Sequence, residues 1–235
     1  MDKNLDIRDL SVVVAVRDHN PNMLTPDFLK GSGVVPTDWE LARPPVLSSR
    51  TTKIVFKNGI KIEAKPGIIT FSEGLIEPKT PHEIEITKLA SKYTAALPNL
   101  DYRAVGINPR RFKTFGDHTQ AAHRYLTEKI LSPGVWQEVG ETPIQAGINL
   151  VYTINGVPLR LSINEAKLQI PEKEAISAIL FSGNFHHDLV GENGNDRLSA
   201  LQNQLENWLK DWDSFQDILV NKFLDQNHLD SIMAA

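Results

Sequence analysis

The densest group of metal-binding and acid–base side chains in this sequence is His186-His187-Asp188, at the end of an extended apolar segment. Successive side chains of a strand point to opposite faces, so we expect Asp188 to share a face with His186 and His187 to point away from both. Imidazole and carboxylate groups are common ligands of divalent metals. His118 or His123 would have to complete such a site by folding over the end of this strand. We therefore hypothesise a metal site made of His118, His186 and Asp188, against the alternative of solvated loop histidines.

A second group of chemically capable residues is basic: Arg110, Arg111 and Lys113. They follow Asn108-Pro109, a pair typical of turns, so we expect them in an exposed loop. Such a loop would bind an anionic partner through charge, with a salt-dependent affinity. Ordinary solvated charge is the alternative interpretation.

Several other chemistries are excluded by the residue inventory. The chain has no cysteine, which removes disulfides, zinc–thiolate sites and cysteine nucleophiles. No serine stands in a Gly-x-Ser-x-Gly sequence, and no Gly-Lys-Ser/Thr sequence follows the glycines near residue 31, so serine hydrolase and phosphate-loop motifs are missing. No cofactor is therefore expected.

The composition is that of a folded protein with no bias toward nucleic acid. Hydrophobic residues make up 41% and charged residues 23% of the chain, and the net charge is -4. Non-specific nucleic-acid binding usually requires clustered Lys and Arg in excess. The N-terminus is charged, and no later window is apolar enough to span a membrane. We expect a cytoplasmic protein that does not bind membranes.

The sequence pattern of the elements that must position these residues occurs twice in the chain. Residues of very different chemistry recur at one constant offset, which chance matches rarely produce. The repeat predicts two similar halves, residues 1–99 and 100–235, that form one continuous body. Insertions near 113–121 and 169–175 distinguish the second half. The recurring residues are Phe28-Leu29, Pro36, Trp39 and Asn58-Gly59, which return as Tyr125-Leu126, Pro133, Trp136 and Asn155-Gly156.

Each half contains the same predicted order of elements: a strand, a short helix, three or four antiparallel strands and a longer helix. Thr25-Pro26-Asp27 supplies an N-cap, a first-position proline and a first-turn acid for the first short helix. Asn-Gly between alternating segments predicts a two-residue hairpin in each half. Residues 136–139 are predicted to be extended, and residues 84–97 to form a helix.

The C-terminal segment has the strongest helical pattern, with large apolar residues spaced by three and four. We expect this stripe to cover the second half of the sheet, with a homodimer seam as the alternative. A cap at Asp213-Ser214 could break the helix. The stripe consists of Leu198, Leu201, Leu205, Trp208, Trp212, Phe215 and Leu219.

This duplicated order resembles the TATA-box-binding-protein fold, over most of the chain, and the chain also resembles an uncharacterised bacterial family. The resemblance implies an α+β fold in which two β-α-β(3-4)-α units form one curved antiparallel sheet with the helices on one face. Two ferredoxin-like α+β halves are the alternative. In DNA-binding relatives the concave face carries basic residues and apolar wedges. The extended segments here offer only scattered basic residues, so DNA binding is not carried over: Lys53, Lys57, Lys61, Arg103 and Arg160.

The sequence therefore favours a non-enzymatic binding protein with a macromolecular partner, which we expect to be a protein. The sheet's open face or the inserted loop would hold that partner. A metal-dependent or acid–base enzyme centred on His186 and Asp188 is the first alternative. Nucleic-acid binding, by fold analogy alone, is the second.

Overall fold

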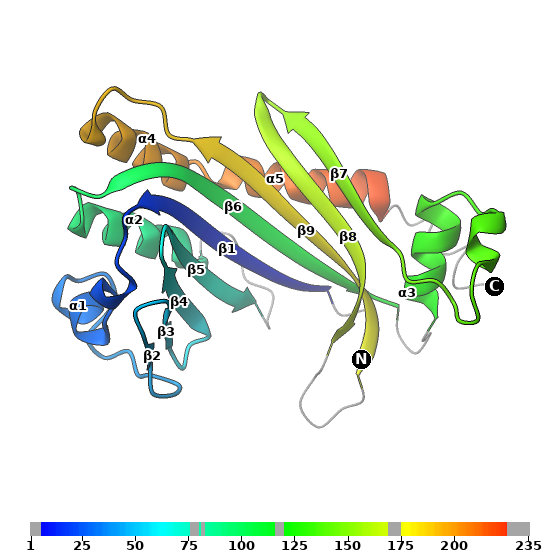
Figure 1. Cartoon of the computed structure of the whole chain (residues 1–235), viewed down its shortest axis with the longest axis horizontal. Coiled ribbons are helices and arrows are strands. Elements are labelled where there is room, and N and C mark those ends of the chain that lie inside the picture. The colour runs from blue at the N-terminus through cyan, green and yellow to red at the C-terminus, as the bar shows by residue number, and fades with distance from the viewer. Residues whose placement is uncertain (1–5, 76–79, 81–82, 116–119, 169–174, 225–235) are drawn as a thin grey trace.

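The protein is built on one antiparallel sheet of nine strands, so the α+β class is confirmed (Figure 1). The computed structural model describes residues 6–75, 80, 83–115, 120–168 and 175–224. The strand order is β2-β3-β4-β5-β1-β6-β9-β8-β7, with the long strands β1 (Asp6–Arg17) and β6 (Asp101–Thr114) side by side near the middle. The other strands are β2 (Val46–Leu47), β3 (Thr52–Val55), β4 (Ile60–Lys65), β5 (Ile68–Leu75), β7 (Gly147–Ile154), β8 (Val157–Leu168) and β9 (Ile176–Asp188).

In Figure 1 the helices of residues 26–31 and 121–124 lie beside the two ends of this sheet, and those of residues 86–96, 194–206 and 209–218 lie behind it. We call the side that they pack on the covered face, and the side turned to the viewer the open face. The helices are α1 (Pro26–Gly31), α2 (Ile86–Ala96), α3 (Ala121–Arg124), α4 (Gly194–Glu206) and α5 (Leu209–Ile218). Single turns of 3-10 helix occupy Pro21–Met23 and Val135–Glu138, and π-helical segments at Tyr125–Ile130 and Leu219–Phe223 extend α3 and α5.

The core lies between the covered face and the helices. In β1 the side chains of Leu10, Val12 and Val14 are fully buried, and each is followed by a partly exposed residue on the open face. This alternation follows from the two-residue period of a strand. Burying each such side chain contributes about 1.5–3 kcal/mol. The covered face therefore supplies most of the stability of the sheet.

Sequence patterns identify the short helix α1 and one of the two hairpins correctly. The Thr25 hydroxyl accepts a hydrogen bond from the Phe28 amide at 3.0 Å, and Pro26 is the first helical residue, as predicted. In the β7–β8 hairpin both Asn155 (φ 51°) and Gly156 (φ 81°) have positive φ, as a two-residue turn requires.

The first hairpin, between β3 and β4, departs from that prediction. Gly59 has a positive φ of 86°, whereas Asn58 does not appear among the positive-φ residues of the chain. The Gly59 amide donates to the Phe56 carbonyl at 3.1 Å, and the Phe56 amide donates to the Ile60 carbonyl at 2.9 Å. This is a type I turn followed by a bulge at glycine, so the two Asn-Gly pairs form different turns.

The predicted turn at Asn108-Pro109 is wrong, because β6 runs straight through it. The register between β6 and β9 passes from the Ile107–Phe185 pair to the Arg110–Ser182 pair without a shift. Pro109 has no amide hydrogen for the ladder. The Asn184 side-chain amide instead donates to Asn108 Oδ1 across the gap.

The C-terminal helix breaks at Asn207, not at Asp213-Ser214 as the sequence suggested. Asn193 caps α4 by accepting a hydrogen bond from the Asp196 amide at 3.0 Å. From Leu201 onward the whole apolar stripe is buried in the chain's own core. The stripe from Leu201 onward is therefore not exposed to form a dimer seam.

The two tryptophans predicted to be equivalent lie in different environments. Trp39 packs edge-on against Phe56, with ring centroids 5.2 Å apart. Trp136 is 41% exposed and lies in a 3-10 turn, so the extended structure predicted for residues 136–139 is wrong. The insertion near 169–175 falls almost wholly outside the described residues, as do positions 116–119 of the other one.

None of the helices in the described part of the chain is both long enough and apolar enough to cross a lipid bilayer.

Candidate functional site

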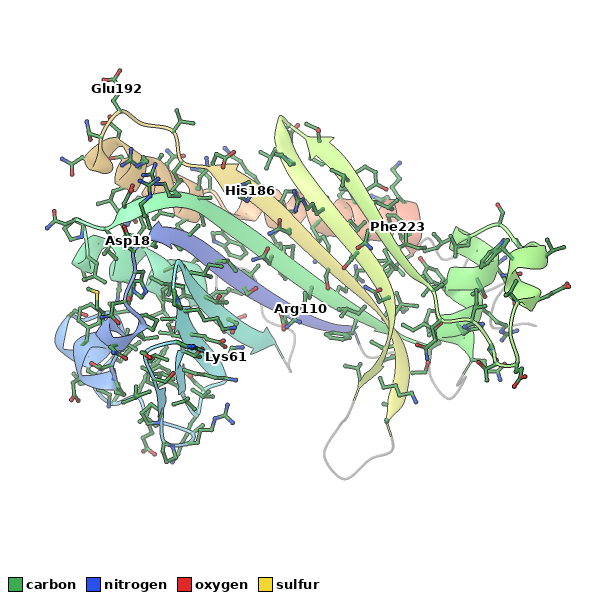
Figure 2. All side chains as sticks on the ribbon, viewed as in Figure 1. Asp18, Lys61, Arg110, His186, Glu192 and Phe223 are labelled. Atoms are coloured by element: carbon green, nitrogen blue, oxygen red, sulfur yellow. The ribbon has the colours of Figure 1, made fainter. Side chains whose placement is uncertain are left out.

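The open face carries mostly small or polar side chains along its middle. Strand alternation places Ser11, Val13 and Ala15 of β1 there, beside Gly106 and Asn108 of β6. On β9 the same face carries Ser182, Asn184 and His186, the last of which is labelled in Figure 2. Short side chains let another molecule approach the sheet closely over a wide area.

Three lysines gather around one glutamate on the outer part of this face. Lys65 Nζ lies 2.9 Å from Glu63 Oε1, and Lys61 Nζ lies 3.8 Å from Glu63 Oε2. Lys53 of β3 is the cross-strand partner of Glu63 in the register. We call Lys53, Lys61 and Lys65 the lysine cluster. It holds three ammonium groups against one carboxylate, and so carries excess positive charge.

The charge of the lysine cluster acts on Glu63 itself. A hydrogen bond from Lys65 lowers the pKa of Glu63 below its ordinary value, and the charges of all three lysines add to this effect. Partial burial acts in the opposite direction and is outweighed. Glu63 therefore stays ionised at neutral pH and still leaves the cluster net positive.

Sequence reasoning missed this cluster because it treated Lys53 and Lys61 as scattered basic residues and did not consider Lys65. The signal was present in the alternation Ile60-Lys61-Ile62-Glu63-Ala64-Lys65, in which every apolar residue is buried. Period two places Lys61, Glu63 and Lys65 on one face. Only the pairing of β3 with β4 brings Lys53 beside them.

The predicted basic loop does not exist as a loop, because Arg110, Arg111 and Lys113 belong to β6. Arg110 lies on the open face, where Nε donates to Asp9 Oδ1 at 2.9 Å and a terminal nitrogen donates to Asp9 Oδ2. This hydrogen bonding to Asp9 raises the pKa of Arg110, so the guanidinium stays charged and the Asp9 carboxylate offsets that charge. Figure 2 labels Arg110 near the middle of the sheet.

The other two basic residues of this group point away from the open face. Arg111 is 9% exposed, and its Nη1 lies 3.3 Å from Gln216 Oε1 of α5. Lys113, two residues later, takes the same side by alternation. The structure therefore separates Arg110 from Arg111 and Lys113, and they do not form one basic surface.

The histidine group divides between the two faces as predicted. His186 and Asp188 share the open face, with Nε2 3.1 Å from Oδ1, and the two side chains are 47% and 83% exposed. His187 turns to the covered face. His118 lies outside the described residues, and His123 pairs with Glu165 Oε1 at 2.9 Å.

The metal hypothesis has little to draw on in the described part of the chain. No group of three or more His, Cys, Asp or Glu side chains with metal-binding geometry occurs among those residues. His186 and Asp188 supply two candidate ligands, and a third would have to come from elsewhere.

No protein family model matches the chain, and no curated protein matches its sequence. The candidate site is therefore defined by its own geometry: a sheet face that no described helix covers, with small or polar side chains in the middle and the lysine cluster toward one edge.

Proposed function

We propose that this is a non-enzymatic binding protein, which holds an anionic macromolecular partner on the open face of its sheet. The observation that carries the proposal is the lysine cluster on a sheet face that no described helix covers. Lysines on a face with an excess of positive charge steer anionic partners and strengthen their complexes. The chain as a whole has a net charge of -4, so this local excess opposes the overall balance.

The size of the open face supports a macromolecular partner rather than a small ligand. Neighbouring strands lie about 4.8 Å apart, so nine strands span roughly 40 Å. A stable protein–protein interface buries about 800 Å² on each partner, which is less than such a face offers. The neutral Arg110–Asp9 pair and the small residues around it would contact the partner through hydrogen bonds and close packing.

We also propose that the sheet arose by duplication and resembles the TATA-box-binding-protein fold, with halves at 1–99 and 100–235. The strand order supports this: each half places its first strand, β1 or β6, in the middle and its last strand, β5 or β9, directly beside it. The DNA-binding activity of that fold does not follow from strand order. A protein partner, a cytoplasmic location and a bacterial origin belong to the same proposal.

A matched pair of double variants tests the proposed surface. Lys61→Glu/Lys65→Glu reverses two charges on the open face, and Lys88→Glu/Lys92→Glu makes the same change, at the same spacing, on the exposed side of α2. Fluorescence anisotropy with a labelled polyglutamate peptide, at low and physiological salt, measures the affinity. We expect salt-dependent binding that weakens about tenfold or more, roughly 1.4 kcal/mol, in the open-face variant alone.

Labelled single-stranded and duplex oligonucleotides provide the second arm of this experiment. Tighter binding of an oligonucleotide than of the peptide, with the same dependence on Lys61 and Lys65, would correct the class of partner. Equal weakening by both double variants, or no salt-dependent binding of any probe, would reject the open face as the site.

A further inference from the structure

A second histidine–aspartate pair lies on the covered face, one residue along the same strand. His187 Nε2 lies 2.7 Å from Asp211 Oδ2 of α5, and the two side chains are only 10% and 12% exposed. Polar groups that are buried to this degree are usually fully hydrogen-bonded. Nδ1 of His187 has no hydrogen-bond partner among the described residues, and it is not fully buried, so a molecule from solvent can reach it.

The contact with Asp211 determines what the free nitrogen can do. An ionised carboxylate accepts hydrogen bonds and cannot donate, so in the neutral imidazole the proton sits on Nε2. Nδ1 is then left with a lone pair.

His187 lines a pocket between the β7–β8 hairpin and the junction of α4 with α5. The pocket has a volume of about 280 Å³. A water molecule takes about 30 Å³ of liquid volume, so this space admits a small molecule of several heavy atoms. Most of the other lining side chains carry amide, hydroxyl or ammonium groups: Asn155, Asn203, Gln204, Asn207, Lys210 and Ser214.

The groups in the pocket favour an anion that also carries an O–H group. Lys210 makes no ion pair with any described residue, so its ammonium group is available to an anionic group. Asp211 disfavours an anion, but its carboxylate is occupied by the imidazole and the ligand meets the ring instead. A ligand with one O–H group donates to Nδ1, whereas a ligand with acceptor atoms alone meets a lone pair.

We propose that this pocket binds a small oxyanion that keeps an O–H group at neutral pH, of the inorganic phosphate class. The ligand's O–H donates to His187 Nδ1, its charged oxygens face Lys210, and the side-chain amides of Asn155, Asn203 and Gln204 complete its hydrogen bonds. Asp211 acts as a positioning residue for the imidazole. This site is separate from the open face, and it does not depend on the partner proposed there.

Inorganic phosphate and sulfate are the two probes that test the proposal. They have nearly the same size and shape, but phosphate keeps at least one O–H at neutral pH and sulfate has none. The imidazole resonances of His187 and His186 are followed by NMR while each salt is added at constant ionic strength. We expect the His187 signals to shift saturably with phosphate, with sulfate at least about tenfold weaker, and the His186 signals to stay in place.

Variants identify the contributing groups. Lys210→Met changes an exposed side chain and should weaken phosphate binding several-fold without affecting folding. His187→Gln removes the oriented imidazole and should weaken it about tenfold. His186→Gln, one residue away on the opposite face, is the matched control and should bind as the unaltered protein does.

The proposal is rejected if phosphate and sulfate bind equally, because that result indicates binding by charge alone, without an O–H hydrogen bond to Nδ1. It is equally rejected if neither probe moves the His187 resonances of the unaltered protein, a measurement that does not depend on any variant folding.

Discussion

Each face of strand β9 presents a histidine that pairs with an aspartate, and the two pairs have opposite surroundings. On the open face His186 and Asp188 lie 3.1 Å apart with side chains 47% and 83% exposed. On the covered face His187 and Asp211 lie 2.7 Å apart at 10% and 12% exposed. Water screens the first pair and competes for its hydrogen bonds, whereas it reaches the second only from the pocket that His187 lines. Two neighbouring histidines of one strand thus belong to two different pairs, one solvated and one buried and oriented.

The same contrast extends over the sheet. The covered face is lined with large apolar side chains that pack on α2, α4 and α5, and it determines stability. The open face carries small or polar residues and the lysine cluster, and it is free to determine binding. Substitutions on opposite faces of one strand should therefore differ sharply, first in the free energy of unfolding and then in affinity.

The largest expected difference is between Phe181→Ala and Ser182→Ala on β9. Phe181 is fully buried among Tyr125 and Phe223, so its truncation leaves a cavity and should cost about 3–5 kcal/mol of unfolding free energy. Ser182 faces the open side, and its truncation should change stability by less than about 0.5 kcal/mol. Chemical denaturation measures both. Similar losses would mean that something also packs on the open face.

The two histidine–aspartate pairs should differ next. Asp211→Ala leaves the Nε2–H of His187 without a partner in a largely buried place, which should destabilise the protein by about 1–3 kcal/mol. Asp188→Ala removes an exposed partner and should cost less than about 1 kcal/mol. Thermal unfolding of both variants provides the comparison. Equal shifts in Tm would show that burial does not distinguish the pairs.

A buried histidine should also make the stability of the protein depend on pH. His19 is 3% exposed, with Nε2 3.1 Å from the Tyr93 hydroxyl, and burial lowers its pKa below the usual 6.5. The unfolded chain therefore binds a proton more readily than the native one, so stability falls as the pH drops below about 6.5.

Two glutamine variants separate this effect from other titrations. His19→Gln keeps a hydrogen-bonding group and cannot titrate, so it should reduce the loss of unfolding free energy between neutral and mildly acidic pH. His186→Gln, on the open face, should leave that loss unchanged. An unaltered pH profile for His19→Gln would contradict the prediction.

The smallest effect is expected at Glu63. Glu63→Gln removes the one carboxylate inside the lysine cluster and, as a surface change, should alter stability by less than about 1 kcal/mol. It should tighten binding of the polyglutamate probe by a few-fold, because the positive charge is no longer offset. Weaker binding would show that Glu63 positions the lysines rather than opposing them.

Local sequence patterns were sufficient wherever the structure depends on neighbouring residues. The α1 cap at Thr25, the turn at Asn155-Gly156, the apolar stripe of the last helices and the opposite directions of His186 and His187 all follow from backbone preference or periodicity. The same approach failed at Asn108-Pro109. There a turn-forming pair is held in a strand by β1 on one side and by the Asn108–Asn184 contact on the other.

The sequence by itself determined the class of the fold, because strand and helix periods are local and the composition provides enough apolar residues for one core. Only the tertiary structure decided which groups work together. Lys53 reaches Glu63 through the register of β3 with β4, the charge of Arg110 is offset by Asp9, and His187 meets Asp211 of a later helix. These pairings depend on strand register and helix packing. Both are set by the burial of distant residues, which no local pattern records.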